Sequence, residues 1–229
     1  MDFKDLITLY EKKREKFGVN VYKHVSEILQ EAKEIHKQDW NRNPTPNGDH
    51  EQSWRAFKGK NLEKLVLYII KDEVEGLGLK VIDGNYLERS NGGNLSEEEN
   101  KVKRNLLVDF GKFGSFLPDV DLIVYDAQNC KVIAVLSSKV TLRERIAQTG
   151  YWKIKLSQDK ITENVKVFFI TPDEDHTLTY NKPMKKGRAI VEFDTDGSYI
   201  MSEEKIQESD KVKPFDKFIV DLRRLVNGK

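Results

Sequence analysis

The spacing of apolar residues predicts helices toward both ends of the chain. Residues 2–16 and 21–38 carry apolar side chains three and four positions apart, the period of a helix that packs on one face. The same spacing predicts a third helix over 53–74 and an amphipathic helix over 215–226 that closes the chain. Residues 41–50 contain two prolines and a glycine, so we expect a loop there.

The middle of the chain follows a different pattern, with short runs of β-branched and apolar residues. Residues 120–125 and 131–137 are apolar on both faces, which is typical of strands at the centre of a sheet. A turn at 126–129 would join them. Weaker signals predict a helix over 141–156, strands at 79–82 and 165–170, and a hairpin formed by 189–193 and 199–201.

This order of elements predicts an α/β fold in which a mixed β-sheet is flanked by helices. We expect one domain over residues 1–229. Within it, residues 1–40 would form a helical N-terminal subregion, and residues 53–229 would form the core that carries the chemistry.

Composition narrows the function classes. The 39 Lys and Arg residues nearly balance the 38 Asp and Glu residues, so no global positive field indicates a nucleic-acid binder. The longest apolar run, 65–70, is far shorter than the ~20 residues that span a bilayer, and the N-terminus has no apolar signal segment. The single cysteine, Cys130, excludes a disulfide framework. We therefore expect a cytoplasmic protein without a membrane partner. The four histidines show no metal-ligand spacing and are predicted to lie at the surface or at helix edges.

The predicted hairpin carries charged residues at one end of two buried strands. A turn centred on Gln128 places Asp119 opposite Ser137, and strand alternation puts Ser137 and Lys139 on one face. Asp119 and Asp121 also share a face. This register predicts that the Asp119 carboxylate lies close to Lys139. Because burial of an unpaired charge is costly, the two groups form either a structural ion pair or a metal-dependent nuclease site.

Phosphodiester cleavage needs Mg²⁺ held by carboxylates and a cation near the scissile phosphate. Asp119 could bind the metal, and Lys139 could orient the attacking water and stabilise the developing charge. Glu63 lies beside the apolar stripe of the third helix, next to Val66, at the correct spacing to join Asp119. The alternative for Glu63 is a surface carboxylate paired with a neighbouring lysine.

Arg143, Glu144 and Arg145 follow Lys139 after a gap of three residues, at the predicted start of a helix. Three consecutive helical residues fan over roughly 200°, so they cannot all face a core. Arginine can donate two hydrogen bonds to guanine, and glutamate can accept one from cytosine. The segment is either a reader of C:G base pairs or a solvated cluster of charges.

Pro118-Asp119 followed by Ser137-Ser138-Lys139 resembles the PD-(D/E)xK nuclease pattern, with Ser137 at a position where that family usually has an acidic residue. A Ser-x-Lys end followed by Arg-Glu-Arg resembles the type II restriction endonucleases that read CCGG or CCNGG. The continuation through Gln148 to Tyr151-Trp152 resembles their BsaWI-type branch. The resemblance rests on residues 53–70 and 118–156.

The resemblance implies a restriction-endonuclease-like fold, a Mg²⁺ cofactor and three sets of residues. Many members carry a second glutamate where this chain has Trp152, and Gln148 is the candidate to replace it. The implied catalytic residues are Glu63, Asp119, Lys139 and Gln148. The implied metal ligands are Asp119, Glu63 and Ser138. The implied DNA-binding residues are Arg143, Glu144, Arg145, Lys185 and Lys186.

The resemblance also implies the reaction and the partners. A homodimer would bind double-stranded DNA and cut both strands at a site with a C/G core, leaving 5′-phosphate and 3′-hydroxyl ends. A cognate DNA methyltransferase would belong to the same system, and the N-terminal helices would form a dimer or DNA-clamping surface. Two alternatives stay open: a repair or junction nuclease that cuts by DNA structure, and a DNA-binding protein of the same fold without catalysis. The departures at Ser137 and Trp152 motivate the second alternative.

Overall fold

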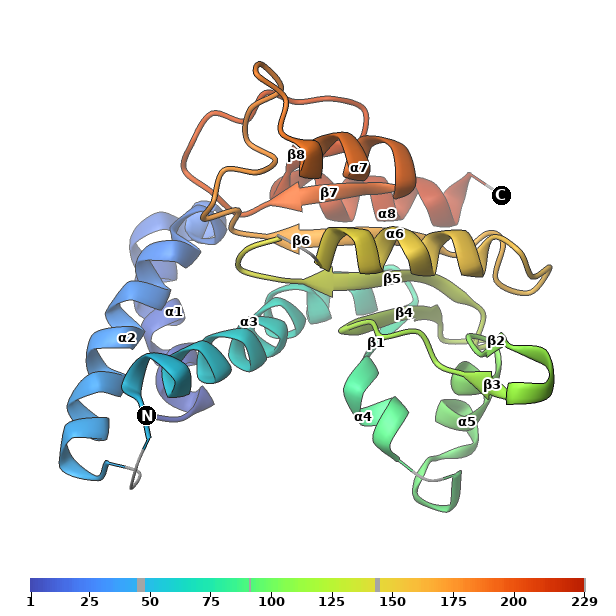
Figure 1. Cartoon of the computed structure of the whole chain (residues 1–229), viewed down its shortest axis with the longest axis horizontal. Coiled ribbons are helices and arrows are strands. Elements are labelled where there is room, and N and C mark those ends of the chain that lie inside the picture. Colours follow the sequence, from blue (N-terminus) through green and yellow to red (C-terminus); the bar gives the residue numbers. More distant parts are fainter. Residues whose placement is uncertain (45–47, 91, 143–144, 229) are drawn as a thin grey trace.

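A six-stranded mixed sheet forms the centre of the protein (Figure 1). The structure is a computed structural model that describes residues 1–44, 48–90, 92–142 and 145–228. The sheet order is β1-β4-β5-β6-β7-β8; β1, β4 and β5 pair antiparallel, and β5 to β8 pair parallel. The strands are β1 (Leu79–Asp83), β4 (Leu122–Asp126), β5 (Val132–Ser138), β6 (Lys166–Thr171), β7 (Gly197–Ile200) and β8 (Val212–Pro214). The predicted mixed sheet flanked by helices is therefore confirmed.

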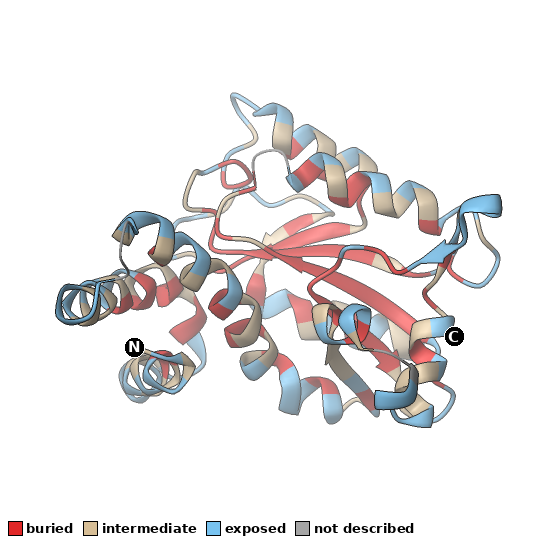
Figure 2. Ribbon diagram, turned by 60° about the horizontal axis from the view of Figure 1, so that its bottom comes forward, coloured by how far each residue is buried: buried red, intermediate tan, exposed pale blue. Residues whose placement is uncertain are grey.

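Helices cover both faces of this sheet (Figures 1 and 2). One face packs against α3 (His50–Glu75) and α8 (Phe218–Asn227), and α1 (Phe3–Phe17) and α2 (Val25–Arg42) pack against α3 beside them. The other face packs against α6 (Arg145–Leu156) and α7 (Lys186–Asp194), and beside them against α4 (Gly84–Arg89) and α5 (Glu97–Arg104). Short elements complete the chain: 3₁₀ turns at Gly18–His24, Gly92–Asn94, Gly111–Phe113 and Phe215–Lys217, and a small sheet of β2 (Val108–Asp109) and β3 (Ser115–Phe116).

Strand alternation divides the core between the two faces. In β6, Phe168 and Ile170 belong to the hydrophobic cluster under α3 and α8, whereas Val167 and Phe169 belong to the clusters on the opposite face. Figure 2 shows the strands as the most buried part of the molecule, between two partly exposed helical layers. The central strands are thus buried on both sides, as their continuous apolar runs predict.

The N-terminal helices share the hydrophobic core with the sheet. Leu6 of α1 and Ile28 of α2 are fully buried in the same cluster as Leu62 of α3 and Leu136 of β5. Burial of this apolar surface, at roughly 25 cal/mol per Å², attaches the N-terminal helices to α3. None of the described helices is long and apolar enough to cross a lipid bilayer.

The predicted hairpin of 189–193 and 199–201 is wrong. Residues 189–193 lie in α7, and β7 pairs parallel with β6 rather than antiparallel with a neighbouring segment. Arg188 and Val191, three residues apart, are both fully buried, and Arg188 donates to the carbonyls of Leu178 and Gln207. A short apolar run fits either a strand or a buried helix, so its period alone does not decide between them.

A close backbone approach beside β4 generates a stability prediction. Gly84 donates from its backbone N–H to the Asp121 carbonyl at 2.8 Å, and a Cβ at Gly84 would lie 2.1 Å from the Val120 carbonyl oxygen. Gly84→Ala should therefore lower the free energy of unfolding by about 1–3 kcal/mol, measured by urea denaturation. Gly59→Ala is the matched control, because no atom lies within 4 Å of its added Cβ. Gly59 lies inside α3, so Gly59→Ala should raise the free energy of unfolding by about 0.5–1 kcal/mol. Equal effects of the two substitutions would contradict this account.

Candidate active site

The beginning of β4 and the end of β5 meet at one edge of the sheet because the two strands are antiparallel. Leu122 pairs with Leu136, and the Asp121 N–H donates to the Leu136 carbonyl at 3.0 Å. Asp121 therefore lies at the position opposite Ser137 that the predicted register assigned to Asp119. The predicted register is wrong by two residues: a longer turn accounts for one of them, and an irregularity in the pairing between Val124 and Tyr125 accounts for the other.

The turn between the strands explains the first residue of this two-residue shift. Cys130 has a φ of 60°, in the left-handed region, and its N–H donates to the Asp126 carbonyl at 2.9 Å. The turn is thus one residue longer than the symmetric turn assumed from the sequence. The second residue of the shift comes from Ile133 of β5, which has no partner in β4 between the Tyr125–Val132 and Val124–Ala134 pairs.

Two carboxylates converge on one ammonium group at this edge. The Nζ atom of Lys139 lies 2.6 Å from Oδ1 of Asp121 and 2.9 Å from Oε1 of Glu63. The second oxygen of Asp121 accepts a hydrogen bond of 2.6 Å from the Ser138 backbone N–H and a longer one of 3.5 Å from the Ser137 hydroxyl. The side chain of Asp121 is only 5% exposed, so its orientation is fixed by these contacts.

Helix α3 brings Glu63 to the sheet. Leu62, Val66 and Ile70 are buried against the strands, and this apolar stripe sets the rotation of the helix. Glu63 lies at the margin of the stripe with its side chain 17% exposed. Asp49 caps the helix by accepting from the Glu51 N–H at 3.1 Å. The sequence therefore predicted correctly that Glu63 faces the edge of the sheet rather than a surface lysine.

The pKa values of Glu63 and Lys139 differ from the ordinary values of these groups. Burial, reinforced by the neighbouring Asp121 carboxylate, raises the pKa of Glu63 to about 7. Burial opposes the charged form of Lys139 as well, but the Asp121 and Glu63 carboxylates outweigh it and raise the Lys139 pKa above its ordinary value. Lys139 is thus an ammonium at neutral pH, and Glu63 exchanges a proton near neutrality.

These residues fit a hard divalent cation. Both carboxylates contact the same small cationic group, so their oxygens are within reach of one ion. The Ser138 hydroxyl is buried and has no hydrogen-bond partner within the described residues. Mg²⁺ is characteristically held by one or two carboxylates, with water and substrate phosphate completing its octahedron.

Asp119 belongs to a different group of polar side chains. Its side chain is 50% exposed, and its Oδ2 atom accepts a hydrogen bond of 2.5 Å from Nε2 of Gln148. Nη1 of Arg145 donates to the Gln148 amide oxygen at 3.0 Å and lies 3.8 Å from the Asp119 carboxylate. Asp119 and Gln148, both predicted near Lys139, thus contact each other and Arg145 at the first turn of α6.

The predicted DNA-binding residues lie at the beginnings of two neighbouring helices. Arg145 is the first residue of α6 and is exposed, whereas Arg143 and Glu144 lie outside the described residues. Lys185 precedes α7 and donates to the Asp175 carbonyl at 2.6 Å; Lys186 begins α7 and is exposed. Helices α6 and α7 pack against each other on the same face of the sheet (Figure 1).

Trp152, at the position where the family resemblance implies a second glutamate, contributes to packing. Its ring packs edge-on against Phe110, with centroids 6.5 Å apart, at the margin of the cluster under α4 and α5. No carboxylate can therefore come from this position. Of the polar residues described at this edge, the structure brings together Glu63, Asp121 and Lys139, and separately Asp119, Arg145 and Gln148.

Comparison with solved structures defines the class of fold. The fold matches restriction endonuclease PspGI, solved with substrate DNA, with a TM-score of 0.58 and 13% identity over 98% of this chain and 93% of PspGI. It matches restriction endonuclease AgeI, solved in a specific DNA complex, with a TM-score of 0.58 and 15% identity over 95% of this chain and 91% of AgeI. This is the fold of the restriction endonucleases.

Sequence comparison defines the family. The family described as BsaWI restriction endonuclease type 2 matches residues 98–221. MjaVIP of Methanocaldococcus jannaschii is 36% identical over 213 residues, which cover 87% of this chain and 92% of MjaVIP. HpyAORF263P of Helicobacter pylori is 40% identical over 135 residues, 58% of this chain and 67% of that protein. Both relatives are described as candidate type II restriction enzymes. The chain belongs to the BsaWI-type family of type II restriction endonucleases, which are site-specific deoxyribonucleases.

The carboxylate that the sequence argument did not single out is Asp121. The sequence does contain a signal for Asp121. Asp121 directly precedes the apolar run that forms β4, whereas two residues separate Asp119 from that strand. A side chain next to a strand is held by the ladder, and one outside the strand is free to turn to solvent. The sequence does not show the irregular turn, and without it the predicted register favours the wrong aspartate.

The raised pKa of Glu63 generates a prediction for stability against pH. A carboxyl group with a pKa of 4.5 when unfolded and about 7 when folded costs stability once it ionises. In the presence of a chelator, Glu63→Gln should match the wild type near pH 4.5. As the pH rises through 7, the variant should become more stable than the wild type, by on the order of 2 kcal/mol. Urea denaturation at pH 5 and pH 8 measures the difference.

Glu51→Gln on the same helix is the control. Lys33 lowers the pKa of Glu51, so its ionised form favours folding and its replacement should bring no gain at pH 8. A Glu63→Gln variant less stable than the wild type at pH 8 would show that the ionised carboxylate favours folding, against this account.

Proposed function

We propose that the chain is a Mg²⁺-dependent endonuclease that cuts both strands of DNA at a specific site with a C/G core. The observation that carries the proposal is the convergence of Glu63 and Asp121 on Lys139 at the edge of the sheet. An ion pair that only closed the hairpin would need Asp121 and Lys139 alone, without Glu63 from α3. This arrangement supplies the acidic oxygens and the fixed positive charge that phosphodiester hydrolysis requires.

Glu63 and Asp121 would hold the Mg²⁺, with Ser138 as an additional oxygen donor. We propose Asp121 in place of Asp119, because Asp121 is the aspartate that contacts Lys139. The bound ion would supply Lewis-acid charge at the phosphate and lower the pKa of a coordinated water. Glu63 must lose its proton to bind a metal, so binding and cleavage should strengthen as the pH approaches and passes about 7.

Lys139 would act as a fixed cation rather than as a general base, because its raised pKa keeps the ammonium protonated. It would donate hydrogen bonds to the attacking water and to the scissile phosphate. The water would give one proton to the surrounding solvent as its oxygen forms a bond to phosphorus, and the bond from phosphorus to the 3′ oxygen would break. The 3′ oxygen takes a proton and leaves as a hydroxyl, while the phosphate stays on the 5′ end.

Base recognition would come from the start of α6. Arg143, Glu144 and Arg145 would contact the C:G pairs in the major groove, where arginine reads guanine O6 and N7. Asp119 and Gln148 would keep Arg145 in position, since both contact its guanidinium. Lys185 and Lys186 at the start of the neighbouring α7 would contact phosphates, which fixes register without reading sequence.

The same proposal extends to assembly and context. A two-fold DNA site cut on both strands needs two active sites, which favours a homodimer. We propose that the N-terminal helices of residues 1–40 form the dimer or DNA-clamping surface of one nuclease domain over residues 1–229, with residues 53–229 as its catalytic core. A cognate methyltransferase would protect host DNA at the same site, and the enzyme would act in the cytoplasm, where that DNA lies.

Exchanging the two aspartates in turn tests the active site. Asp121→Asn removes the buried metal-binding charge, and cleavage of a plasmid with Mg²⁺ should fall by at least about a thousandfold. Asp119→Asn is the matched control two residues away. It should retain far more cleavage and show its main effect on specificity, because its partners are Arg145 and Gln148. Single-turnover rates on plasmid DNA decide between the two. Loss of cleavage with Asp119→Asn and its retention with Asp121→Asn would reverse the assignment.

Recognition is tested by comparing Arg145 with Lys186. A good bidentate contact to a base discriminates by about 1–3 kcal/mol, so Arg145→Ala should reduce the ratio of cognate to scrambled-duplex affinity by roughly ten- to a hundredfold. Lys186→Ala should weaken binding to both duplexes alike and flatten the salt dependence. Binding titrations at one fixed salt concentration, with Ca²⁺ replacing Mg²⁺ to suppress cleavage, provide the measurement. An equal loss on both duplexes with Arg145→Ala would make that residue a phosphate contact only.

A further inference from the structure

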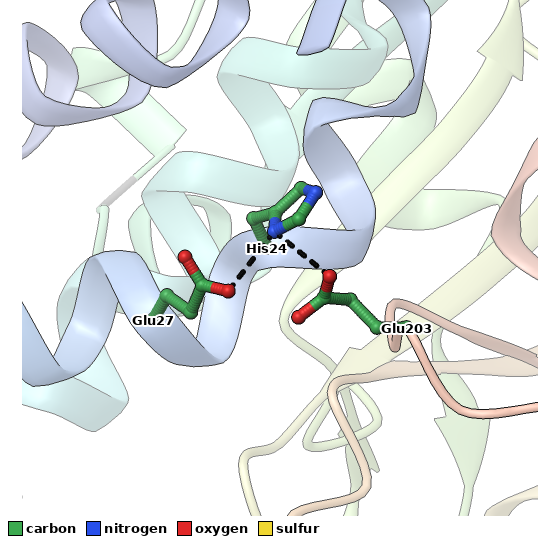
Figure 3. Close-up of side chains that lie close together, drawn as sticks. All are labelled: His24, Glu27 and Glu203. Atoms are coloured by element: carbon green, nitrogen blue, oxygen red, sulfur yellow. Dashed lines mark hydrogen bonds and ion pairs between the residues drawn. The ribbon is translucent and has the colours of Figure 1, made fainter. Parts of the chain in front are cut away.

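A second cluster of metal-ligating side chains lies where the N-terminal helices meet the loop that follows β7. His24, at the end of the 3₁₀ turn after α1, faces Glu27 in the first turn of α2 and Glu203 in that loop (Figure 3). Within the described ranges, these three form the one set of His, Cys, Asp or Glu side chains whose ligand atoms all lie within 4.8 Å of one another.

The geometry of the cluster matches a metal-coordination shell. Nδ1 of His24 lies 3.1 Å from Oε1 of Glu27 and 3.2 Å from Oε1 of Glu203. Ligands held at about 2.0–2.1 Å from a tetrahedral Zn²⁺ are about 3.3 Å apart, so these contacts have the spacing of neighbouring ligands. Figure 3 shows one oxygen of each carboxylate directed toward the same ring nitrogen of His24.

A single hydrogen on His24 cannot satisfy both neighbouring carboxylates. A histidine Nδ1 carries at most one hydrogen, and here two carboxylate oxygens compete for it. The His24 side chain is only 9% exposed and stacks on Phe17, with ring centroids 3.6 Å apart, so it cannot turn away. His24 thus lies at the edge of a helix, as the sequence predicts, but its side chain is buried. A divalent cation would satisfy all three groups at once.

Lys13 orients Glu27 in a way that suits a metal ligand. Its other oxygen, Oε2, lies 2.7 Å from Nζ of Lys13, which orients the carboxylate from behind, as partners of metal ligands commonly do. The hydrogen bond from Lys13, helped by His24, lowers the pKa of Glu27 to about 2, so Glu27 is ionised at neutral pH. A cavity of about 380 Å³, also lined by Glu27 and Glu203, opens beside the cluster and gives an ion a path and room for water.

We propose that His24, Glu27 and Glu203 form a second, structural binding site for a transition-metal dication, with Zn²⁺ as the preferred ligand. Nitrogen together with carboxylate oxygen suits Zn²⁺ better than Mg²⁺, which prefers oxygen donors alone. A bound ion would connect segments about 180 residues apart in the chain, and so fasten the N-terminal helices to the loop after β7. Because the same loop accepts hydrogen bonds from Tyr180 and Arg188, the ion would also steady the approach to α7.

The test uses the full-length protein with the candidate active site disabled. In a Glu63→Gln, Asp121→Asn background, calorimetric titration with Zn²⁺ should reveal one remaining ion per chain. Co²⁺ at that site should give the visible absorption of a four-coordinate centre. In the wild type, Zn²⁺ added after chelation should raise the melting temperature, because the ion binds the folded state only.

Substitution of Glu203 then identifies the site. Its side chain is 54% exposed in a loop, so Glu203→Gln should fold normally. It should weaken Zn²⁺ binding at least about tenfold and abolish the Co²⁺ spectrum. Glu204→Gln is the matched control: it lines the same cavity but is outside the cluster, and it should bind as the parent does. His24→Ala should lose the ion as well, and circular dichroism would report whether the variant still folds.

Two results would overturn the proposal. One is a background protein that binds no Zn²⁺, which would leave only a histidine in hydrogen-bond contact with two carboxylates. The other is unchanged binding in Glu203→Gln, which would place the remaining ion elsewhere. Neither result bears on cleavage with Mg²⁺, so the second site and the proposed nuclease function fail or stand separately.

Discussion

The contact of Lys139 with two carboxylates is the constraint on which the rest of the site depends. A buried ammonium is costly unless it is paired, and it is paired here by groups from two different layers of the fold. Asp121 comes from the edge of the sheet, and Glu63 comes from the helix packed across it. The packing of α3 on β4 and β5 therefore decides whether the charges are balanced, and the apolar stripe of α3 indirectly sets the chemistry.

This constraint divides the polar residues at the sheet edge into two groups with different tasks. In the buried group of Glu63, Asp121 and Lys139, the pKa values of Glu63 and Lys139 are raised and the side chains are held by mutual contacts. The exposed group around Asp119 lies at the first turn of α6, where contacts can rearrange around DNA. The two groups are joined by a few residues of backbone before β4, so in the proposed function base reading would lie next to bond cleavage.

Family membership shows the class of enzyme, and local geometry shows which side chains are in contact. The family match and the relative from Methanocaldococcus jannaschii establish the class of enzyme, but they assign no role to an individual side chain. Geometry assigns contacts, and it favours an aspartate two residues away from the one in the motif. The departures from the usual pattern at Ser137 and Trp152 are accommodated structurally, because Ser137 hydrogen-bonds Asp121 and Trp152 packs against Phe110.

The sequence by itself determined the mixed α/β fold, the central strands and the orientation of Glu63, because these follow from the period of apolar residues along one segment. It also determined the resemblance to the BsaWI-type enzymes, through Ser-x-Lys and Arg-Glu-Arg. Only the tertiary structure decided between Asp119 and Asp121, because a turn longer by one residue and one unpaired residue in β5 together move the register of the hairpin by two. The same holds for the helix at 189–193 and for the meeting of His24 with Glu203. Both depend on contacts between distant segments, which no local pattern contains.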